Sequence, residues 1–332
     1  MSDGFNLRLR RPRPSVVACS PTLGALGAVN LMPACFAKED ALEARIARSS
    51  RRRRAVSVLL RWLTYLAAAV TAAVLLFVVG YILVRGVPAL TPDLFQWEYT
   101  SENVSLLPAL ASTVIMALLA LALAVPVGVG AAIYLVEYAR RGSRFVRLVR
   151  VTAETLQGIP SIIYGLFGML FFVTACGWGL SFLSGACTLA IMVLPVIMRT
   201  TEEALMAVPD SYREGGFGLG AGRLRTVACC VLPSAVPGIL GGVILALGRC
   251  VGEVAALLFT AGTVAQIPDF GGQGIFALFD SCRTLAVHMY TLACEGLHVN
   301  EAYATSVVLL ILVLLLNAAM RVVAQKMEVS KK

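Results

Sequence analysis

Long apolar stretches separated by short polar or basic ones make up most of the chain. The first, residues 62–84, contains no charged side chain and as a helix would be about 34 Å long, enough to cross a lipid bilayer with slight tilt. The second covers residues 106–136, and Pro126 within it is expected to kink the helix. Each of these stretches therefore predicts one membrane-spanning helix.

The third apolar stretch, residues 155–198, is uncharged over 44 residues and is too long for one crossing. It predicts a hairpin of two spanning helices that turns near Gly177 and Gly179, since glycine favours tight turns. Two more spans are expected over 234–262 and 302–320. The pattern thus predicts an all-α polytopic membrane protein with six transmembrane helices and both termini on one side.

A polar segment lies between the fourth and fifth predicted spans, in residues 201–233, which we call the polar insert. Thr200, with Glu203 three residues later, has the sequence of a capping box and predicts the start of a short helix. Pro209 is expected to end that helix, because the residue before a proline avoids the α conformation.

A second capping box, Ser211 with Glu214, opens another short helix within the polar insert. This helix is expected to run to about Leu219, because Gly220 supplies a C-terminal stop. A short helix of this kind that stands outside the membrane is suited to docking against a partner protein.

Composition supports the membrane assignment. Of the 332 residues, 58% are hydrophobic and only 14% are charged, which is far from the composition of soluble domains. The net charge of +9 does not indicate nucleic-acid binding, since the basic residues lie beside apolar stretches without interleaved aromatic residues. Counted by loop, 24 Lys and Arg fall on the side of the termini and polar insert, against Arg85 and Arg283 on the other. The positive-inside rule then places both termini and the polar insert in the cytoplasm.

Residues 1–55 form a separate basic extension that holds eleven of the 28 Lys and Arg residues. Such a segment is expected to be disordered, solvated and attracted to anionic lipid. The six-helix membrane domain is expected to occupy residues 56–332.

Two ionisable residues, Arg249 and Glu253, fall inside the fifth predicted span, where a charge is costly. Their i, i+4 spacing would put both on one helix face, so one interpretation is a structural pair that neutralises itself. The interpretation that we favour is that they line a path for an ion, with Gly248 and Gly252 leaving room for close approach.

Arg199 lies at the cytoplasmic end of the fourth predicted span, where it is either an interface anchor or part of the same path. A guanidinium can donate two parallel hydrogen bonds to a tetrahedral oxyanion. A carboxylate such as Glu253 can in addition accept the proton of a protonated oxyanion. Arg199, Arg249 and Glu253 together therefore favour a small anion as the species that is transported.

The loop between the last two predicted spans contains Cys282 and Cys294. If this loop is extracytoplasmic, a disulfide between the two is allowed by the redox compartment. No cysteine or histidine pattern in the sequence has the spacing of a metal site, and no metal or other cofactor is expected.

The polar insert resembles the EAA loop of binding-protein-dependent ABC importer permeases. In that family Glu-Ala-Ala is followed after three residues by Gly and, nine residues later, by Ile, one residue and Leu-Pro. The matching positions are Glu214, Gly220, Leu232 and Pro233. The departures are Gly215 and Gly216 in place of the alanines and Cys230 in place of isoleucine. Each glycine is expected to weaken the helix by about 1 kcal/mol relative to alanine.

Three further stretches, 156–168, 195–205 and 279–296, are similar to the phosphate importer permease of PstA type. The sequence RTTEEAL within 195–205 distinguishes this type from the PstC-type subunit. The resemblance implies a type I ABC importer permease with a MetI-like fold, in the inner membrane of a bacterium. Such a chain is a non-catalytic subunit of a transporter of inorganic phosphate.

The same resemblance implies partners and roles. The expected partners are a PstC-type permease subunit, two PstB-type ATPase subunits that bind ATP and Mg, and a PstS-type phosphate-binding protein. Arg199 and Arg249 occupy positions associated with transport, and Glu253 is placed with them. The residues expected to couple the chain to the ATPase are Arg213, Glu214, Gly220, Leu232 and Pro233.

The sequence leaves several alternatives open. It lacks the GxxxxGK[ST] loop that binds nucleotide phosphates, so ATP is expected to act through a partner. The EAA-like pattern does not identify the cargo, and a permease for sulfate, molybdate or phosphonate is an alternative. A membrane enzyme, a passive channel and a sensory scaffold acting through the basic extension are others, although no catalytic pattern supports the enzyme.

Overall fold

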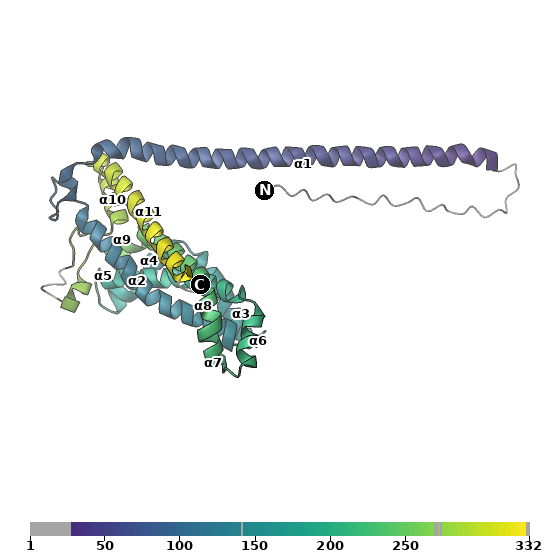
Figure 1. The fold of residues 1–332 in the computed structure, drawn as a ribbon. Helices are drawn as coiled ribbons and strands as arrows, with labels where there is room; N and C mark the ends of the chain where they lie inside the picture. Colours follow the sequence, from purple (N-terminus) through teal and green to yellow (C-terminus); the bar gives the residue numbers. More distant parts are fainter. Residues whose placement is uncertain (1–27, 141, 269–271, 273, 330–332) are drawn as a thin grey trace. The chain divides into compact units, whose positions relative to one another are not determined.

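The computed structural model describes residues 28–140, 142–268, 272 and 274–329 (Figure 1). Every regular element in this part of the chain is helical, of the α, 3-10 or π type, which confirms the all-α prediction. The chain divides into two units, Met1–Leu76 and Phe77–Lys332.

The first unit contains most of helix α1, Ala28–Gly86. The first predicted span is confirmed as the second half of this helix, since Val56–Ala89 is long and apolar enough to cross a membrane. α1 also includes residues 28–55, in contrast to the disorder predicted for the basic extension. The physical reason is that residues 37–55 are rich in Ala and Arg, which have high helix propensity. The rest of the extension, 1–27, lies outside the described residues.

The second unit begins with the end of α1 and two short 3-10 turns, η1 (Val87–Ala89) and η2 (Pro92–Phe95). Helix α2 (Leu107–Ile133) follows and continues into a π-helical turn, η3 (Tyr134–Tyr138). The second predicted span is therefore confirmed to within a few residues. Pro126 lies inside α2, and the kink expected there stays a prediction.

The third apolar stretch forms a hairpin, as predicted, but its first limb begins later and is shorter. Helix α3 (Arg144–Gln157) is bent by 102° from the helix that combines α4 (Ser161–Gly168) and η4 (Met169–Ala175). Five helices in the described residues are long and apolar enough to cross a membrane, and this bent pair is the sixth candidate. The structure is thus consistent with six spans.

The hairpin turns at Gly177 and Gly179, which have φ angles of 70° and 68°, as predicted for glycine. The returning helix, α5 (Phe182–Met206), runs on through Thr200. The Thr200 hydroxyl donates a hydrogen bond to the carbonyl of Val196 (2.9 Å), as it does inside a helix. The first predicted capping box is therefore wrong, because no new helix begins there.

The polar insert forms two short α-helices, α6 (Asp210–Gly218) and α7 (Arg223–Thr226). A π-helical turn, η5 (Val227–Val231), then leads into α8 (Leu232–Val251). The fifth predicted span is broken, because α8 ends at Val251 and a separate helix, α9 (Ala255–Thr260), follows.

The remaining elements are η6 (Gly274–Phe279), α10 (Leu285–Glu295) and α11 (Val299–Val329). Helix α10 packs against both α11 and the start of the bundle at α2. The sixth predicted span is confirmed within α11.

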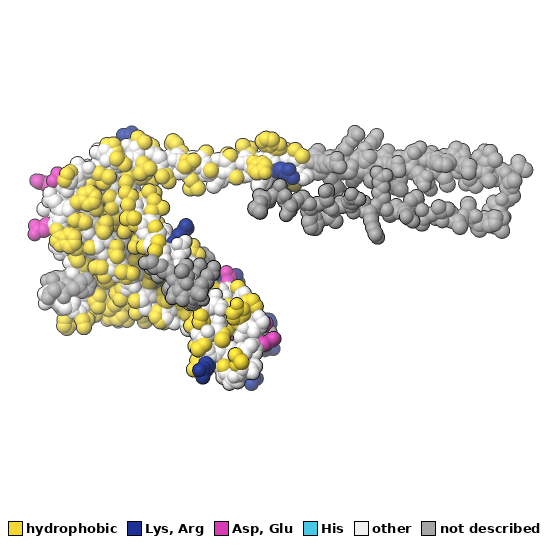
Figure 2. Space-filling view, viewed as in Figure 1, with side chains coloured by type: hydrophobic (Ala, Val, Ile, Leu, Met, Phe, Trp, Pro, Cys, Tyr) yellow, Lys and Arg dark blue, Asp and Glu magenta, His cyan; other side chains and the backbone are white. Residues whose placement is uncertain are grey.

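The core of the second unit lies where α2, α5 and α8 pack together. Leu189, Ile197 and Leu247 are among its buried side chains. Gly242 lets α8 approach α5 closely, since a Cβ at this position would lie 1.9 Å from Oγ1 of Thr200. Figure 2 shows hydrophobic side chains along the flank of this bundle and charged side chains gathered near its ends. This is the surface expected of a domain whose flank faces lipid.

Candidate functional site

Helix α6 is the short helix predicted within the polar insert, with a different start. Pro209 is its N-cap residue, and no side-chain cap hydrogen bond is present, so the Ser211–Glu214 capping box is wrong. Asp210 lies in the first turn, where its charge complements the helix dipole. Gly220, with φ of 79°, lies just beyond the C-terminal end, as predicted.

The two glycines that replace the family's alanines have different surroundings. A Cβ on Gly216 would lie 2.7 Å from Cγ2 and 2.9 Å from Oγ1 of Thr226, whereas a Cβ on Gly215 would meet nothing within 4 Å. Gly216 therefore allows α6 to pack closely on α7. Gly215 has no such role.

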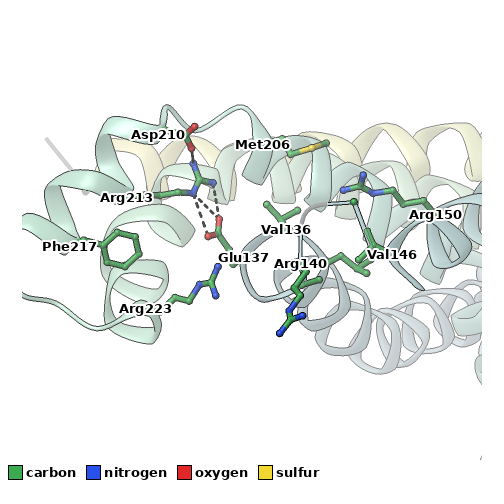
Figure 3. Close-up of a pocket in the computed structure, with 13 residues that line it drawn as sticks. Val136, Glu137, Arg140, Val146, Arg150, Met206, Asp210, Arg213, Phe217 and Arg223 are labelled. Atoms are coloured by element: carbon green, nitrogen blue, oxygen red, sulfur yellow. Dashed lines mark hydrogen bonds and ion pairs between the residues drawn. The ribbon is translucent and has the colours of Figure 1, made fainter. Parts of the chain in front are cut away.

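Arg213 fixes α6 to the rest of the second unit. Its Nη2 donates to Oε1 of Glu137 (2.7 Å) and to the carbonyl of Leu205 (2.9 Å), and its Nη1 donates to the carbonyl of Val208 (2.9 Å) and to Oδ1 of Asp210 (3.1 Å). Figure 3 shows the Arg213 side chain extended from α6 between Asp210 and Glu137. The hydrogen bond with Glu137 is the main cause that raises the pKa of Arg213. Arg213 therefore faces inward and positions α6, and is not itself part of the exposed surface.

A cavity of about 500 Å³, which we call the coupling cavity, lies between η3, α3 and α6. It is rich in arginine, and Figure 3 shows Arg140 and Arg223 among the side chains that line it. The Arg223 guanidinium lies 5.5 Å from the centre of the Tyr138 ring. The charged residues that line the cavity are Glu137, Arg140, Arg150, Asp210, Arg213 and Arg223.

The outer surface of α6 and α7 exposes several large apolar side chains. Leu219 is 91% exposed and Leu224 is 74% exposed, and Tyr212 and Phe217 are about half exposed. Glu214 is also exposed and has no ion pair in the described part of the chain. Exposed apolar side chains in one small area mark a protein interaction surface. We call these four residues and Glu214 the docking surface.

The other predicted coupling residues lie on the junction with α8. Leu232 is partly buried and packs against the cluster that contains Leu205, Val208 and Val231. Pro233 is in the first turn of α8, where a proline is tolerated. Leu232 thus stabilises the base of the polar insert, while Glu214 and Gly220 lie on its surface.

Arg199 is paired with two carboxylates. It forms ion pairs with Glu154 of α3 and with Glu203 one turn later on α5, and its side chain is 42% exposed. Close by, Arg150 of α3 forms an ion pair with the buried Glu202. Sequence reasoning missed Glu154 and Arg150, because these contacts join residues some fifty positions apart and no spacing rule predicts them.

Arg199 and Arg249 lie at different depths of the bundle. Helices α5 and α8 run antiparallel, with Thr200 facing Gly242 and Ala204 facing Gly238. Arg249 is seven residues beyond Gly242, which corresponds to about 10 Å farther along α8. The structure does not bring the two arginines into one site.

Arg249 and Glu253 are also not the i, i+4 pair that the sequence predicts. The helix ends at Val251, so the rule for residues on one helix face does not apply to Glu253. Glu253 is buried, and its Oε1 accepts a hydrogen bond from the backbone N–H of Ala256 (3.3 Å) at the start of α9. No ion pair joins Arg249 to any described residue, and its side chain is half-buried. The positive charge of Arg249 is therefore not neutralised within the described part of the chain.

The disulfide that the sequence allows between Cys282 and Cys294 is not formed in the structure, where both cysteines are free. Cys282 is buried before α10, and Cys294 is exposed in the last turn of α10. Between Leu285 and Cys294 the helix rises about 13 Å, roughly twice the Cα separation that a disulfide spans. In the described residues no group of three or more His, Cys, Asp or Glu side chains could hold a metal ion.

Comparison with known proteins identifies the family. Residues 124–329 match the family described as "Binding-protein-dependent transport system inner membrane component". Over 270 residues the chain is 36% identical to the "Probable ABC transporter permease protein YqgI" of Bacillus subtilis (strain 168), covering 77% of this chain and 90% of that protein. This match and the family match each cover most of the second unit.

A second relative is the "Phosphate transport system permease protein PstA 1" of Mycobacterium tuberculosis (strain CDC 1551 / Oshkosh). The chain is 39% identical to it over 154 residues, which is 46% of this chain and 50% of that protein, so the match spans half of the relative's length. A solved structure, a bacterial ABC transporter involved in the import of the acidic polysaccharide alginate, has a TM-score of 0.56 at 17% identity. That match covers 78% of this chain and 95% of the other, and it shows the fold alone. The chain is therefore a member of the binding-protein-dependent transport system inner membrane component family, with the fold of an ABC importer permease.

Proposed function

We propose that this chain is the permease subunit of an ATP-driven importer of inorganic phosphate. It would pass phosphate from an extracytoplasmic binding protein into the cytoplasm by alternating access. The name of the Mycobacterium tuberculosis relative and the RTTEEAL sequence at 199–205 support phosphate as the cargo. The observation that carries the proposal is Arg249, a half-buried guanidinium in an apolar span that no described carboxylate neutralises. Such a charge is costly unless an anion compensates it.

The helix break beside Arg249 supports a transport path at this place. Transporter sites are commonly built where spanning helices are discontinuous, because the freed backbone groups and nearby charges meet there. Glu253 lies in the break, and its bond to the N–H of Ala256 sets the carboxylate's position. A protonated phosphate could accept hydrogen bonds from Arg249 and donate one to Glu253. Fully ionised sulfate carries no proton and could not donate a hydrogen bond to Glu253.

Arg199 has a smaller role in this proposal. Because Glu154 and Glu203 already neutralise it, it would have to release one carboxylate before it could bind phosphate. It lies on α5 at the level where α3 reaches the bundle, beyond Arg249 in the direction of the polar insert. We therefore assign it to the cytoplasmic end of the path, where the anion is released.

The docking surface would connect the permease to the ATPase subunits that drive transport. Helix α6 would dock in a groove of an ATPase subunit, and ATP and Mg would bind to two PstB-type ATPases and not to this chain. A PstC-type permease would complete the membrane part, and a PstS-type protein would deliver phosphate. The chain would be multi-pass in the bacterial inner membrane, with both termini and α6 in the cytoplasm.

Uptake of labelled phosphate in a strain without its own permease tests the proposal. We expect Arg249→Ala to abolish uptake while the assembled complex is still recovered, and Arg321→Ala, which removes an exposed charge in the C-terminal half of α11, to leave uptake unchanged. Competing sulfate, molybdate and phosphonate should not reduce phosphate uptake. Uptake by the Arg249→Ala transporter at the normal rate would contradict the assignment of the path, and strong competition by another oxyanion would contradict the cargo.

A further inference from the structure

A second arginine without a neutralising partner lies at the opposite end of the bundle from the coupling cavity. Arg283 precedes α10 and is only 6% exposed. Its Nη1 donates to the hydroxyl of Thr291 (3.3 Å), but Nε and Nη2 have no hydrogen-bond partner and no ion pair joins Arg283 to any described residue. A buried guanidinium with two unmet donors is unfavourable as it stands.

Arg283 lines a cavity of about 650 Å³ that no other step of the proposed transport uses. Besides Tyr99, the cavity is lined by three neutral side chains that can donate hydrogen bonds, Trp97, Thr263 and Gln266, and by one exposed carboxylate, Glu98. These groups suit a partly protonated oxyanion. The buried positive charge and the neutral donors can bind its oxygens, and the single carboxylate can accept its proton in a hydrogen bond.

The cavity and the coupling cavity lie at opposite ends of α2. Pro108, in the first turn of α2, lines the cavity at Arg283, and Glu137, just past the end of α2, lines the coupling cavity. A helix of this length places them about 40 Å apart along its axis. With α6 in the cytoplasm, a placement that rests on the proposed function, the Arg283 cavity opens on the extracytoplasmic side.

In this structure the ring of Tyr99 covers the Arg283 guanidinium, with the ring centre 4.6 Å from Cζ. Tyr99 belongs to a tight turn that the Asn103 side chain holds, through bonds to the backbone N–H of Thr100 (2.9 Å) and the carbonyl of Glu98 (2.9 Å). The turn ends at Val104, a buried β-branched residue with φ of 45°. A β-branched residue in this conformation is strained, and such strain is concentrated at clamps and switch segments.

We propose that the Arg283 cavity is a phosphate-receiving site on the extracytoplasmic side, and that Tyr99 is its cover. Phosphate replaces the Tyr99 ring over the guanidinium and satisfies Nε and Nη2, while Thr263 and Gln266 bind its other oxygens. The Tyr99 turn closes over Arg283 when no anion is bound, through the ring contact described above. The site lies ahead of Arg249 on the way inward and is separate from it.

The neighbouring His288 does not compete for the anion. It is fully buried, and its ring packs edge-on against Tyr99, with 6.1 Å between the ring centres. Burial and the charge of Arg283 lower the pKa of His288 to about 3, so the imidazole is neutral at physiological pH. Arg283 is therefore the positive charge that an anion in this cavity meets.

The site can be tested without measuring transport, because Trp97 lines the cavity. The full-length chain carries three tryptophans, and Trp62→Phe with Trp178→Phe leaves Trp97 alone. Labelled with 5-fluorotryptophan and placed in lipid nanodiscs, this protein gives one ¹⁹F resonance. We expect inorganic phosphate, but not chloride at equal ionic strength, to shift this resonance with saturation.

Variants distinguish the proposed site from a general effect of the anion. Arg283→Gln should abolish the shift, and Arg283→Lys, which keeps the charge but not the fork, should raise the half-saturating phosphate concentration roughly tenfold. Tyr99→Ala should lower that concentration several-fold, since no cover has to open. Arg85→Gln, which removes an exposed charge at the same end of the bundle, should change nothing.

Three outcomes would overturn the proposal. The first is that phosphate still shifts the resonance in both Arg283 variants. The second is that phosphate causes no shift in the starting protein. The third is that a phosphate-free binding protein shifts the resonance while phosphate alone does not. The last result would assign Arg283 to a carboxylate of a docking partner. Because the readout is binding at Trp97, a transporter that fails in uptake for other reasons does not affect the result.

Discussion

Arg213 of α6 and Glu137, just beyond the end of α2, form an ion pair of 2.7 Å that joins residues 76 positions apart. The Arg213 and Glu137 side chains are only 15% and 7% exposed, and the pair holds α6 against the second membrane span. A force applied to α6 by a partner would therefore pass directly to α2. This contact gives the short helix a mechanical connection to the bundle.

Breaking that ion pair should uncouple the transporter. Glu137→Ala leaves a largely buried guanidinium without its main partner, and we expect a loss of about 3 kcal/mol in the stability of the α6 attachment. Phosphate-stimulated ATP hydrolysis should continue in the complex while phosphate uptake falls at least tenfold. The exchange Glu137→Arg with Arg213→Glu should restore part of the uptake. An unchanged ratio of uptake to hydrolysis in Glu137→Ala would show that force does not pass through this pair.

Reversing the charge of Glu214 should weaken docking and leave the fold intact. Glu214 is exposed on the docking surface and forms no ion pair in the described residues, so Glu214→Arg removes no internal contact. We expect less ATPase to be recovered with the purified permease and less phosphate-stimulated hydrolysis. Glu295→Arg, an exposed charge reversal at the end of α10, is the matched control. Normal assembly and stimulated hydrolysis in Glu214→Arg would contradict docking through this surface.

The adjacent glycines of α6 should respond in opposite directions to alanine. Gly215→Ala adds a methyl group in open space and should stabilise the helix by about 0.5–1 kcal/mol. Gly216→Ala forces α6 away from Thr226 and should destabilise the protein and reduce ATPase assembly. Thr226→Ala in the Gly216→Ala background removes both atoms that would clash and should recover assembly. Thermal unfolding and copurification of the ATPase measure these effects, and equal responses of the two glycines would disprove the packing argument.

Much of the fold follows from the sequence because the relevant signals are local. Uncharged length predicts the spans, Gly177 and Gly179 predict the hairpin turn, and Gly220 predicts the end of α6. The capping boxes fail at Thr200 and Ser211 because tertiary context decides where a helix begins. α5 already has its backbone hydrogen bonds at Thr200, and Pro209 takes the N-cap position of α6.

The candidate site is less predictable because its contacts are not local. Arg249 and Glu253 have the spacing of a pair, but the helix ends between them, and a glycine at 252 alone does not predict a break. The pairing of Arg213 with Glu137, and of Arg199 with Glu154, requires knowledge of how α2, α3 and α5 pack. The two arginines are therefore predictable from the sequence as site residues, but the carboxylates that pair with them are not.

Orientation in the membrane can be tested with single cysteines. Cys294 is exposed at the end of α10, and Leu219, the most exposed residue of the docking surface, can be changed to cysteine in a cysteine-free background. We expect a membrane-impermeant maleimide to label Cys294 in intact cells, and to label Leu219→Cys only after permeabilisation. Labelling in the reverse order would invert the topology and would remove α6 from the reach of a cytoplasmic ATPase.

The buried His288 should make the protein less stable in acid. Its pKa is lowered to about 3 in the folded chain, from an ordinary value of 6.5, because burial and the charge of Arg283 disfavour the imidazolium. Below pH 6.5 the unfolded chain binds the proton and the folded chain does not, so stability is full above pH 6.5 and is lost as pH falls towards 3. The slope contributed by this one group reaches at most about 1.4 kcal/mol per pH unit.

This pH dependence can be isolated by substitution. His288→Leu replaces the ring with an apolar side chain that does not titrate, so the decline in thermal unfolding temperature between pH 6.5 and pH 4 should become shallower. His298→Gln, which changes the other histidine of the chain at a partly exposed position, is the control and should keep the original slope. If His288→Leu and His298→Gln show the same slope as the starting protein, His288 titrates normally and is not held neutral beneath Tyr99.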